Sequence, residues 1–431
     1  MNSALKAQTE KGLVPERCRG ISIRQSGRYL PGQTFWDWLS GVPLGRSYVR
    51  FNRTPLIHVC DSVGGFFAAM MLGYVMLQLG GWWLLFLLLI LPLTIGRARK
   101  CHMTIVHQAV HDQLYQLKNY RHRKLANRLT AEAIGVLLWI PDFLTYRKAH
   151  AVSHHNPEET ATPKDLDGKV VFTTRYGCQL SDDRPERMGD VDDTATTKDV
   201  DGREVFALGF VPGMPREYYG TLLRSTASSP RFYLADFWQR VHFSLFLAPW
   251  YRRVASALFL TGVLTLTWVS GEWLALTVLY LLPVFPLFKL CGLLQQLSEH
   301  MWGTHMELVG SRERLPLVCQ GRFLFDPYPG AELRRGARLR AIAQWWLRVP
   351  YHLLVRVCVL GGDLPAHHDH HFHPRAPDWV CATRACVARM SVDTGRQYSH
   401  AWSLGEALDR VFTAMSSAPP LEQKWLDELK K

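Results

Sequence analysis

The stretch FFAAMMLGYVMLQLGGWWLLFLLLILPLTI, Phe66 to Ile95, decides the fold class of this chain. Between Leu56 and the end of this stretch the only charged side chain is Asp61, and a membrane-spanning helix needs about 20 apolar residues. The run is long enough for two short spans that break at its Gly-Gly pair. It therefore predicts a transmembrane hairpin, with spans at about 56–79 and 82–96.

A second pair of apolar segments follows at about 254–270 and 273–290, divided only at Ser270, Gly271 and Glu272. Buried core helices of a large soluble protein are the competing interpretation, but the length of the paired runs favours membrane spans. We therefore expect an all-α integral membrane protein with two transmembrane helical hairpins, or about four spans.

Basic residues flank both hairpins and are absent from their tips. They are Arg46, Arg50, Arg53, Arg97, Arg99, Lys100, Arg252, Arg253 and Lys289. This distribution predicts that both termini lie in the cytoplasm, together with a helical cap that carries the histidines described next. The formal net charge of +13 then indicates a surface that faces anionic lipid or an acidic protein, and needs no nucleic-acid partner. The nine cysteines form no CxxC pair, which is typical of a reducing compartment.

Histidines recur in three clusters that ordinary surface or core positions do not produce. The clusters are His107 with His111, His150 with His154 and His155, and His367 with His370 and His371, and His300 joins them. Residues three or four apart share one face of a helix, so the imidazoles of each cluster can point at one ion. His155 lies slightly off this face, where it can serve a second ion.

The number of these nitrogens fits two six-coordinate metal ions better than one zinc ion, which needs only three or four ligands. Imidazole by itself does not select among zinc, copper, nickel and iron. Other histidines stand alone, and we assign them ordinary structural or surface roles. These are His58, His122, His242, His352 and His400.

An acidic insertion at 160–206 separates the second cluster from the second hairpin. It contains a repeat, TATPKDLDGKVVF at Thr160–Phe172 and TATTKDVDGREVF at Thr194–Phe206. The DxDG segments lack the remaining ligands of a calcium loop, so turns leading into short strands are the better interpretation. The chain thus divides into a cytoplasmic N-terminal segment at 1–55, a membrane domain at 56–376 and a cytoplasmic C-terminal segment at 377–431.

Several motifs resemble the histidine boxes of the membrane-bound fatty acid desaturase and hydroxylase superfamily. HQAVHD at 107–112, HAVSHH at 150–155 and HHDHHFHP at 367–374 are similar to its three boxes. SEHMWG at 298–303 resembles an additional histidine segment, and TPKDLDG resembles the continuation of the second box. The spacing of the third box matches at His367, His370 and His371, so His368 and His373 are left out, as is His305.

The resemblance implies a non-haem diiron centre that uses O2 to attack an unactivated carbon of a long acyl chain, with desaturation as the expected reaction. Its two Fe ions would be held by His107, His111, His150, His154, His155, His300, His367, His370 and His371. Asp112, Glu299 and Asp369 are candidates for orienting these imidazoles through hydrogen bonds. The substrate would be an acyl-CoA, an acyl-carrier protein or a phospholipid. Because the chain has no iron–sulfur, dinucleotide or haem-attachment motif, electrons would come from a separate ferredoxin or b-type cytochrome with its reductase.

Two alternatives stay open. The first is a hydroxylase or monooxygenase of an alkyl, terpenoid or carrier-bound acyl substrate with the same metal site. The second is a metal-binding membrane transporter, although after Asp61 the first pair of spans offers almost no ionisable pathway. A zinc protease is disfavoured because the sequence has no HExxH motif.

Overall fold

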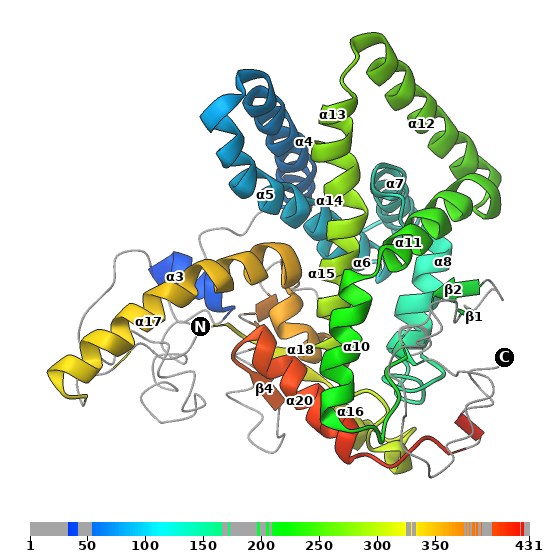
Figure 1. Cartoon of the computed structure of the whole chain (residues 1–431). Helices are drawn as coiled ribbons and strands as arrows, with labels where there is room; N and C mark the ends of the chain where they lie inside the picture. Colours follow the sequence, from blue (N-terminus) through cyan, green and yellow to red (C-terminus); the bar gives the residue numbers. More distant parts are fainter. Residues whose placement is uncertain are drawn as a thin grey trace.

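Helices make up most of the chain (Figure 1). The computed structural model describes mainly residues 33–41, 54–165, 209–324, 333–374 and 399–422, with short pieces between them. Four helices are long and apolar enough to cross a membrane, namely Pro55–Leu79, Gly81–Val110, Trp250–Ser270 and Trp273–Leu297. The predicted helical class, with four candidate spans paired into two hairpins, is confirmed.

The first hairpin joins α4 (Pro55–Leu79) to α5 (Leu87–Lys100) through the 3-10 turn Gly81–Phe86. Helix α4 ends at Gly80, and both Gly80 and Gly81 have positive φ angles, 61° and 54°. Glycine adopts this conformation at no steric cost, because it has no Cβ. The Gly-Gly pair therefore forms the turn that the sequence predicts.

The second span is longer than the predicted 82–96. It continues through the π-helical turn Cys101–Val106 into α6 (His107–Val110). Two of the basic residues that suggested its end are compensated, because Arg97 and Lys100 both pair with Asp61, at 2.7 and 2.9 Å. The first histidine cluster consequently begins on the end of this span rather than after it.

The second hairpin consists of α12 (Trp250–Ser270) and a returning helix interrupted at Phe285. Its segments are α13 (Trp273–Ala275), the π-helical turn Leu276–Leu281, α14 (Leu282–Val284) and α15 (Pro286–Leu297). The predicted end at 290 is wrong, since Lys289 lies inside α15 and pairs with Asp236 at 3.0 Å. His300 therefore follows the end of this span directly.

The far tips of the two hairpins are tied together by Glu272. Its Oε1 atom accepts hydrogen bonds from the Tyr74 hydroxyl at 2.9 Å and from the Gln78 amide at 3.0 Å. Both hairpins project from the same side of the molecule in Figure 1. Their outer surfaces expose large apolar side chains, with Trp82 at 85% and Val269 at 79%. A surface of this kind suits contact with lipid rather than with water.

Between the hairpins, α7 (Tyr120–Leu138) and the helix Phe143–His154 meet at an angle of 106°. The apolar segment AEAIGVLLWIPDF at 131–143 contains this bend. Trp139 ends α7 with a positive φ of 55°, and the Asp142 carboxylate caps the start of α8 (Phe143–Arg147). The pair also qualifies as a broken span or a re-entrant loop.

The remaining described α-helices form the body beneath the hairpins. They are α3 (Gln33–Ser40), α10 (Arg216–Ser228), α11 (Pro230–His242), α16 (Leu315–Val318), α17 (Arg335–Leu354), α18 (His367–Phe372) and α20 (Leu404–Ser417). Figure 1 places α18 beside α20, and the long α17 extends away from the hairpins on the side of α3.

The all-α prediction needs one correction, because the described part of the chain contains four short strands. β3 (Gln320–Arg322) pairs in parallel with β4 (Ser399–Ala401). β1 (Thr196–Lys198) and β2 (Glu204–Phe206) are antiparallel and flank the second DxDG segment. This pairing agrees with the strands predicted for the second copy of the repeat. Residues 166–170 of the first copy lie outside the described residues, as does most of the N-terminal segment.

Candidate metal centre

Each histidine cluster lies at a local irregularity of a helix. His107 directly follows a π-helical turn, and His150 and His154 lie within another. His367 follows a 3-10 turn. A π-helical turn brings residues five apart onto one face, and a 3-10 turn brings residues three apart. With such turns, the imidazoles that face each other can differ from those expected for a regular α-helix.

All nine predicted ligands come together in two groups. The first group contains His107, His111, His150, His155 and His370, and the second contains His154, His300, His367 and His371. In each group, one candidate ligand atom from every residue lies within 4.8 Å of all the others. The groups adjoin, since the His155 and His371 rings are 4.5 Å apart between centroids. The site can thus hold two neighbouring metal ions.

The pairing of histidines differs from the regular-helix expectation in two clusters. His150 shares its group with His155 rather than with His154, because the π-helical turn between them brings residues five apart together. In the third cluster, His370 belongs to the first group, while its neighbour His371 belongs to the second. Adjacent residues point in different directions on a helix, so one short helix supplies both groups.

Imidazole nitrogens face one another at close range in both groups. The Nε2–Nε2 distances are 3.2 Å for His150–His155, 3.2 Å for His111–His370, 3.3 Å for His154–His300 and 3.1 Å for His367–His371. A neutral imidazole has a single ring proton, which satisfies at most one such contact. The buried Nε2 of His107 has no hydrogen-bond partner among the described residues. A cation bound by the lone pairs satisfies these nitrogens together.

Burial also fixes the protonation state of these side chains. It holds the pKa of His155, His300 and His371 well below the usual range, and the neighbouring imidazoles lower each pKa further. The pKa of His367 and of His370 is lowered for the same main reason. The rings are therefore neutral at pH 7, which is the form that binds metal ions.

A carboxylate that sequence reasoning did not select orients one of the ligands. The buried Asp165 lies 2.9 Å from Nδ1 of His154, which leaves Nε2 of that ring for the metal. The Thr160 hydroxyl donates to the His154 carbonyl at 2.7 Å and holds the same turn. Asp165 belongs to the TPKDLDG segment, so the resemblance of that segment was the available signal.

The three carboxylates predicted to orient imidazoles make other contacts. Asp112 pairs with Arg147 at 2.8 Å and so joins the first two boxes. Asp369 holds Arg389 through both carboxylate oxygens. Glu299 pairs with Arg322 at 3.2 Å, and its 3.9 Å approach to Nε2 of His367 is too long for a hydrogen bond. In the described part of the chain these carboxylates contact basic side chains, and their role in orienting imidazoles stays a prediction.

The histidines excluded from the ligand set lie outside both groups. His305 is half-exposed and lies 3.6 Å from Glu307, and the His373 ring lies 3.4 Å from Asp369. His368 is buried and contacts the Cys386 sulfur at 3.6 Å. The exclusion of these residues from the ligand set therefore agrees with the two groups found in the described part of the chain.

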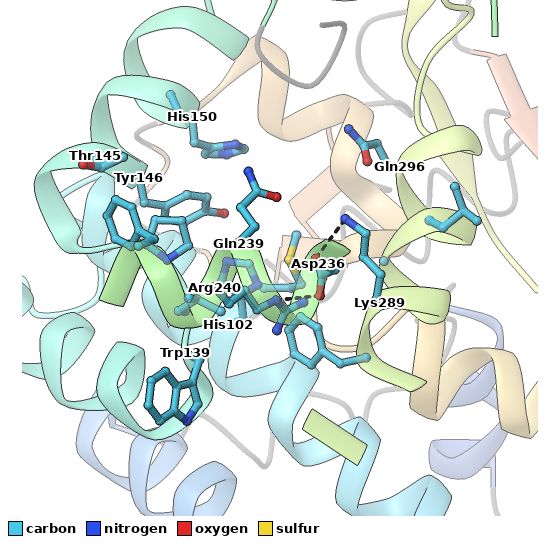
Figure 2. A pocket seen from close by; sticks show the side chains of 18 of the residues that line it. His102, Trp139, Thr145, Tyr146, His150, Asp236, Gln239, Arg240, Lys289 and Gln296 are labelled. Carbon is cyan, nitrogen blue, oxygen red and sulfur yellow. Dashed lines mark ion pairs between the residues drawn. The ribbon is translucent and has the colours of Figure 1, made fainter. Parts of the chain in front are cut away.

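A cavity of about 800 Å³ lies beside the two groups and reaches one histidine of each, His150 and His367. Its walls come from α5, the turn between α7 and α8, α8, α11 and α15, and include apolar side chains such as Trp139 and Phe288. Figure 2 shows charged and amide side chains in the same walls. His102, which the sequence did not single out, also lines the cavity and stacks on Phe288 with the ring centroids 5.8 Å apart.

Comparison of the chain with protein-family models, with curated proteins and with solved structures finds no match. The geometry of the two histidine groups and of the adjoining cavity is therefore the basis for any functional conclusion.

Proposed function

We propose that this chain is a membrane-bound oxidase that holds two iron ions in its histidine groups and uses O2 to desaturate an alkyl or acyl chain. The observation that carries the proposal is the pair of adjoining groups of five and four histidines at the ends of apolar helices. Similarity of the histidine boxes to those of membrane-bound desaturases and hydroxylases supports the same proposal.

The composition of the two groups favours a transition metal. Both are built from imidazole alone in the described residues, whereas calcium and magnesium require oxygen ligands. A structural zinc site is complete with four ligands and one ion, whereas the histidines here form two adjoining groups. Iron suits the nitrogen ligands and also changes its oxidation state. Bound iron would supply the oxygen activation and electron transfer needed to break a C–H bond.

The side chains of the protein prepare the site in three ways. Burial keeps the imidazoles neutral and excludes bulk water from the two groups. The contact between Asp165 and Nδ1 of His154 fixes the orientation of that ring. The cavity at His150 and His367 gives a substrate carbon access to both groups. The chain contributes ligands, orientation and a dry compartment, and a separate ferredoxin or cytochrome would deliver the electrons.

The cavity and the candidate spans also support a location within the membrane. An apolar substrate dissolved in the bilayer can enter between the helices of the two hairpins without crossing water. With both hairpin tips on the far side, the two termini and the histidine groups would lie in the cytoplasm, where soluble electron donors are present.

The reaction is tested with membranes that contain the protein, a deuterated acyl substrate, 18O2 and a reduced external donor. Loss of two hydrogens without incorporation of 18O, slowed by deuterium at the attacked carbon, is the expected result in mass spectrometry. One 18O atom in the product would assign the chain as a hydroxylase instead. Stoichiometric zinc without iron, in protein grown with both metals, would refute the proposal altogether.

A further inference from the structure

The cavity beside the histidine groups contains more positive than negative charge. Its charged lining residues in the described part of the chain are Arg99, Arg240, Lys289, Asp236 and Glu299. Glu299 is already paired with Arg322, which does not line the cavity. Asp236 is then the one remaining carboxylate for three cations. It pairs with Arg240 at 2.8 Å and with Lys289 at 3.0 Å, as Figure 2 shows.

Lys289 adds a positive charge beyond the one that neutralises Asp236. Asp236 and Arg240 are one helical turn apart on α11 and already form a complete ion pair. The side chain of Lys289 comes from α15, is 24% exposed and adds a second cation to the same carboxylate. In Figure 2 its ammonium group lies between Asp236 and Gln296. An anion placed there would restore neutrality and would receive hydrogen bonds from Lys289.

Arg99 is another cation of the cavity, and the described residues form no ion pair with it. It is only 1% exposed and belongs to the second candidate span. Its guanidinium donates to two neutral acceptors, the Gln295 side chain and the Val359 carbonyl. Its Nε has no hydrogen-bond partner in the part of the chain that is described. A buried arginine at this depth is costly unless an anion or a polar network compensates it, so it also favours a negatively charged occupant.

The position of these cations limits where a substrate chain can extend. Lys289 and Gln296 line the same face of α15 two turns apart, which is about 10 Å along the helix axis. Glu299 and the metal-binding His300 follow directly. Lys289 therefore lies about two helical turns from the part of the same cavity that reaches the histidine groups, while Arg99 contacts Gln295 between them. Apolar walls at Trp139 and Phe288 accompany this path.

We propose that the substrate is a single-chain amphiphile whose anionic head group, a carboxylate or a phosphate, binds inside this cavity beside Lys289, Arg240 and Arg99. This inference rests on the proposed oxidase function and specifies its substrate class. It differs from the acyl-CoA, acyl-carrier protein or phospholipid that the sequence resemblance implies, because the head group itself lies in the cavity. The head group bound at Lys289 sets which carbon of a short chain reaches His150 and His367.

Calorimetric titration of the purified full-length protein in an uncharged detergent tests the proposal without any need for turnover. The ligands are dodecanoate, dodecyl phosphate and methyl dodecanoate, which share one chain length. At least one of the two anions should bind about tenfold or more tightly than the neutral ester, and the preferred anion identifies the head group. Equal affinity for all three ligands would overturn the proposal.

Two substitutions change the subsite in opposite directions. Lys289→Met removes the charge, keeps an unbranched side chain of nearly the same reach and leaves the pair of Asp236 with Arg240 intact, and it should weaken anion binding about tenfold or more. Asp236→Asn removes the competing carboxylate and should strengthen it. Lys424→Met is the matched control, because that lysine is 65% exposed and pairs with Glu422 outside the cavity. Unchanged anion affinity in Lys289→Met would contradict the assignment.

The binding data separate this inference from the proposed function. Anion binding that depends on Lys289, in a protein that oxidises no chain, would refute the oxidase and keep the subsite. Oxidation of methyl dodecanoate at the same rate as of the anions, with no effect of Lys289→Met on the KM, would keep the oxidase and refute the subsite.

Discussion

Removal of one histidine from each group should affect two metal ions separately. His370 is one of five candidate ligands in the first group, and His371 is one of four in the second, although they are adjacent in sequence. His370→Ala should therefore release metal from the first group alone, and His371→Ala from the second alone. Each variant should keep about one equivalent of metal per chain instead of two.

The size of each effect follows from the number of ligands that remain. A closed four-ligand metal site binds with about 10–16 kcal/mol. If every ligand contributes equally to this binding free energy, one ligand of four contributes about 3–4 kcal/mol and one of five about 2–3 kcal/mol. His371→Ala should then weaken its ion about 100- to 1000-fold, and His370→Ala about 30- to 200-fold. His371→Ala, which leaves three histidines in its group, should therefore lose its ion at a lower chelator concentration than His370→Ala.

Metal content by mass spectrometry during a chelator titration measures both effects. His373→Ala is the matched control, because its ring belongs to the same box but lies beside Asp369, outside both groups. The exposed His122→Ala should also have no effect. Loss of both ions at one chelator concentration in both variants would mean that the nine histidines form a single site, and the assignment to two groups would be wrong.

Three further predictions concern orientation, pH and topology. Asp165→Asn should weaken the second ion about 10- to 100-fold in the same titration, because it loses the anion that orients His154. Burial lowers the pKa of His400 from 6.5 to about 4. As the pH falls, this imidazole is therefore protonated in the unfolded metal-free protein at a higher pH than in the folded protein. Stability in denaturant titrations should fall as the pH drops from about 6.5 towards 4, and His400→Gln should remove from that fall the contribution of this one imidazole, up to about 3 kcal/mol. Trp82→Cys in a Cys60→Ser background should react with an impermeant thiol reagent only from the non-cytoplasmic side, and labelling from the cytoplasm would contradict the hairpin.

The candidate spans could be predicted because apolar length is a local property of the sequence. Their ends could not, since the charges that suggested an end are compensated by residues far along the chain. Asp61 is 36 residues from Arg97, and Lys289 pairs with Asp236 on another helix. Composition gives the charge of a residue but not its partner, so both returning helices continue past the predicted limits.

The candidate ligands were predictable for a similar reason, and their grouping was not. Clustering of histidines is visible in the sequence, whereas the division between the two groups depends on backbone irregularities. A regular helix would place His150 with His154, and the π-helical turn places it with His155 instead. The orienting carboxylate was missed because proximity in sequence favoured Asp112 and Asp369. Asp165 reaches His154 only through the turn that Thr160 stabilises.

The basic residues beside the spans carry less topological information than their positions in the sequence imply. The positive-inside rule concerns charges that remain in cytoplasmic loops. Arg99 and Lys289 instead line the cavity, and Arg252 is buried against Glu132 at 3.2 Å. The positive charge of these residues therefore has a second explanation, since Arg99 and Lys289 line the cavity and Arg252 forms an ion pair in the core. For this reason the labelling of Trp82→Cys decides the orientation, while Lys289→Met tests what the charge binds.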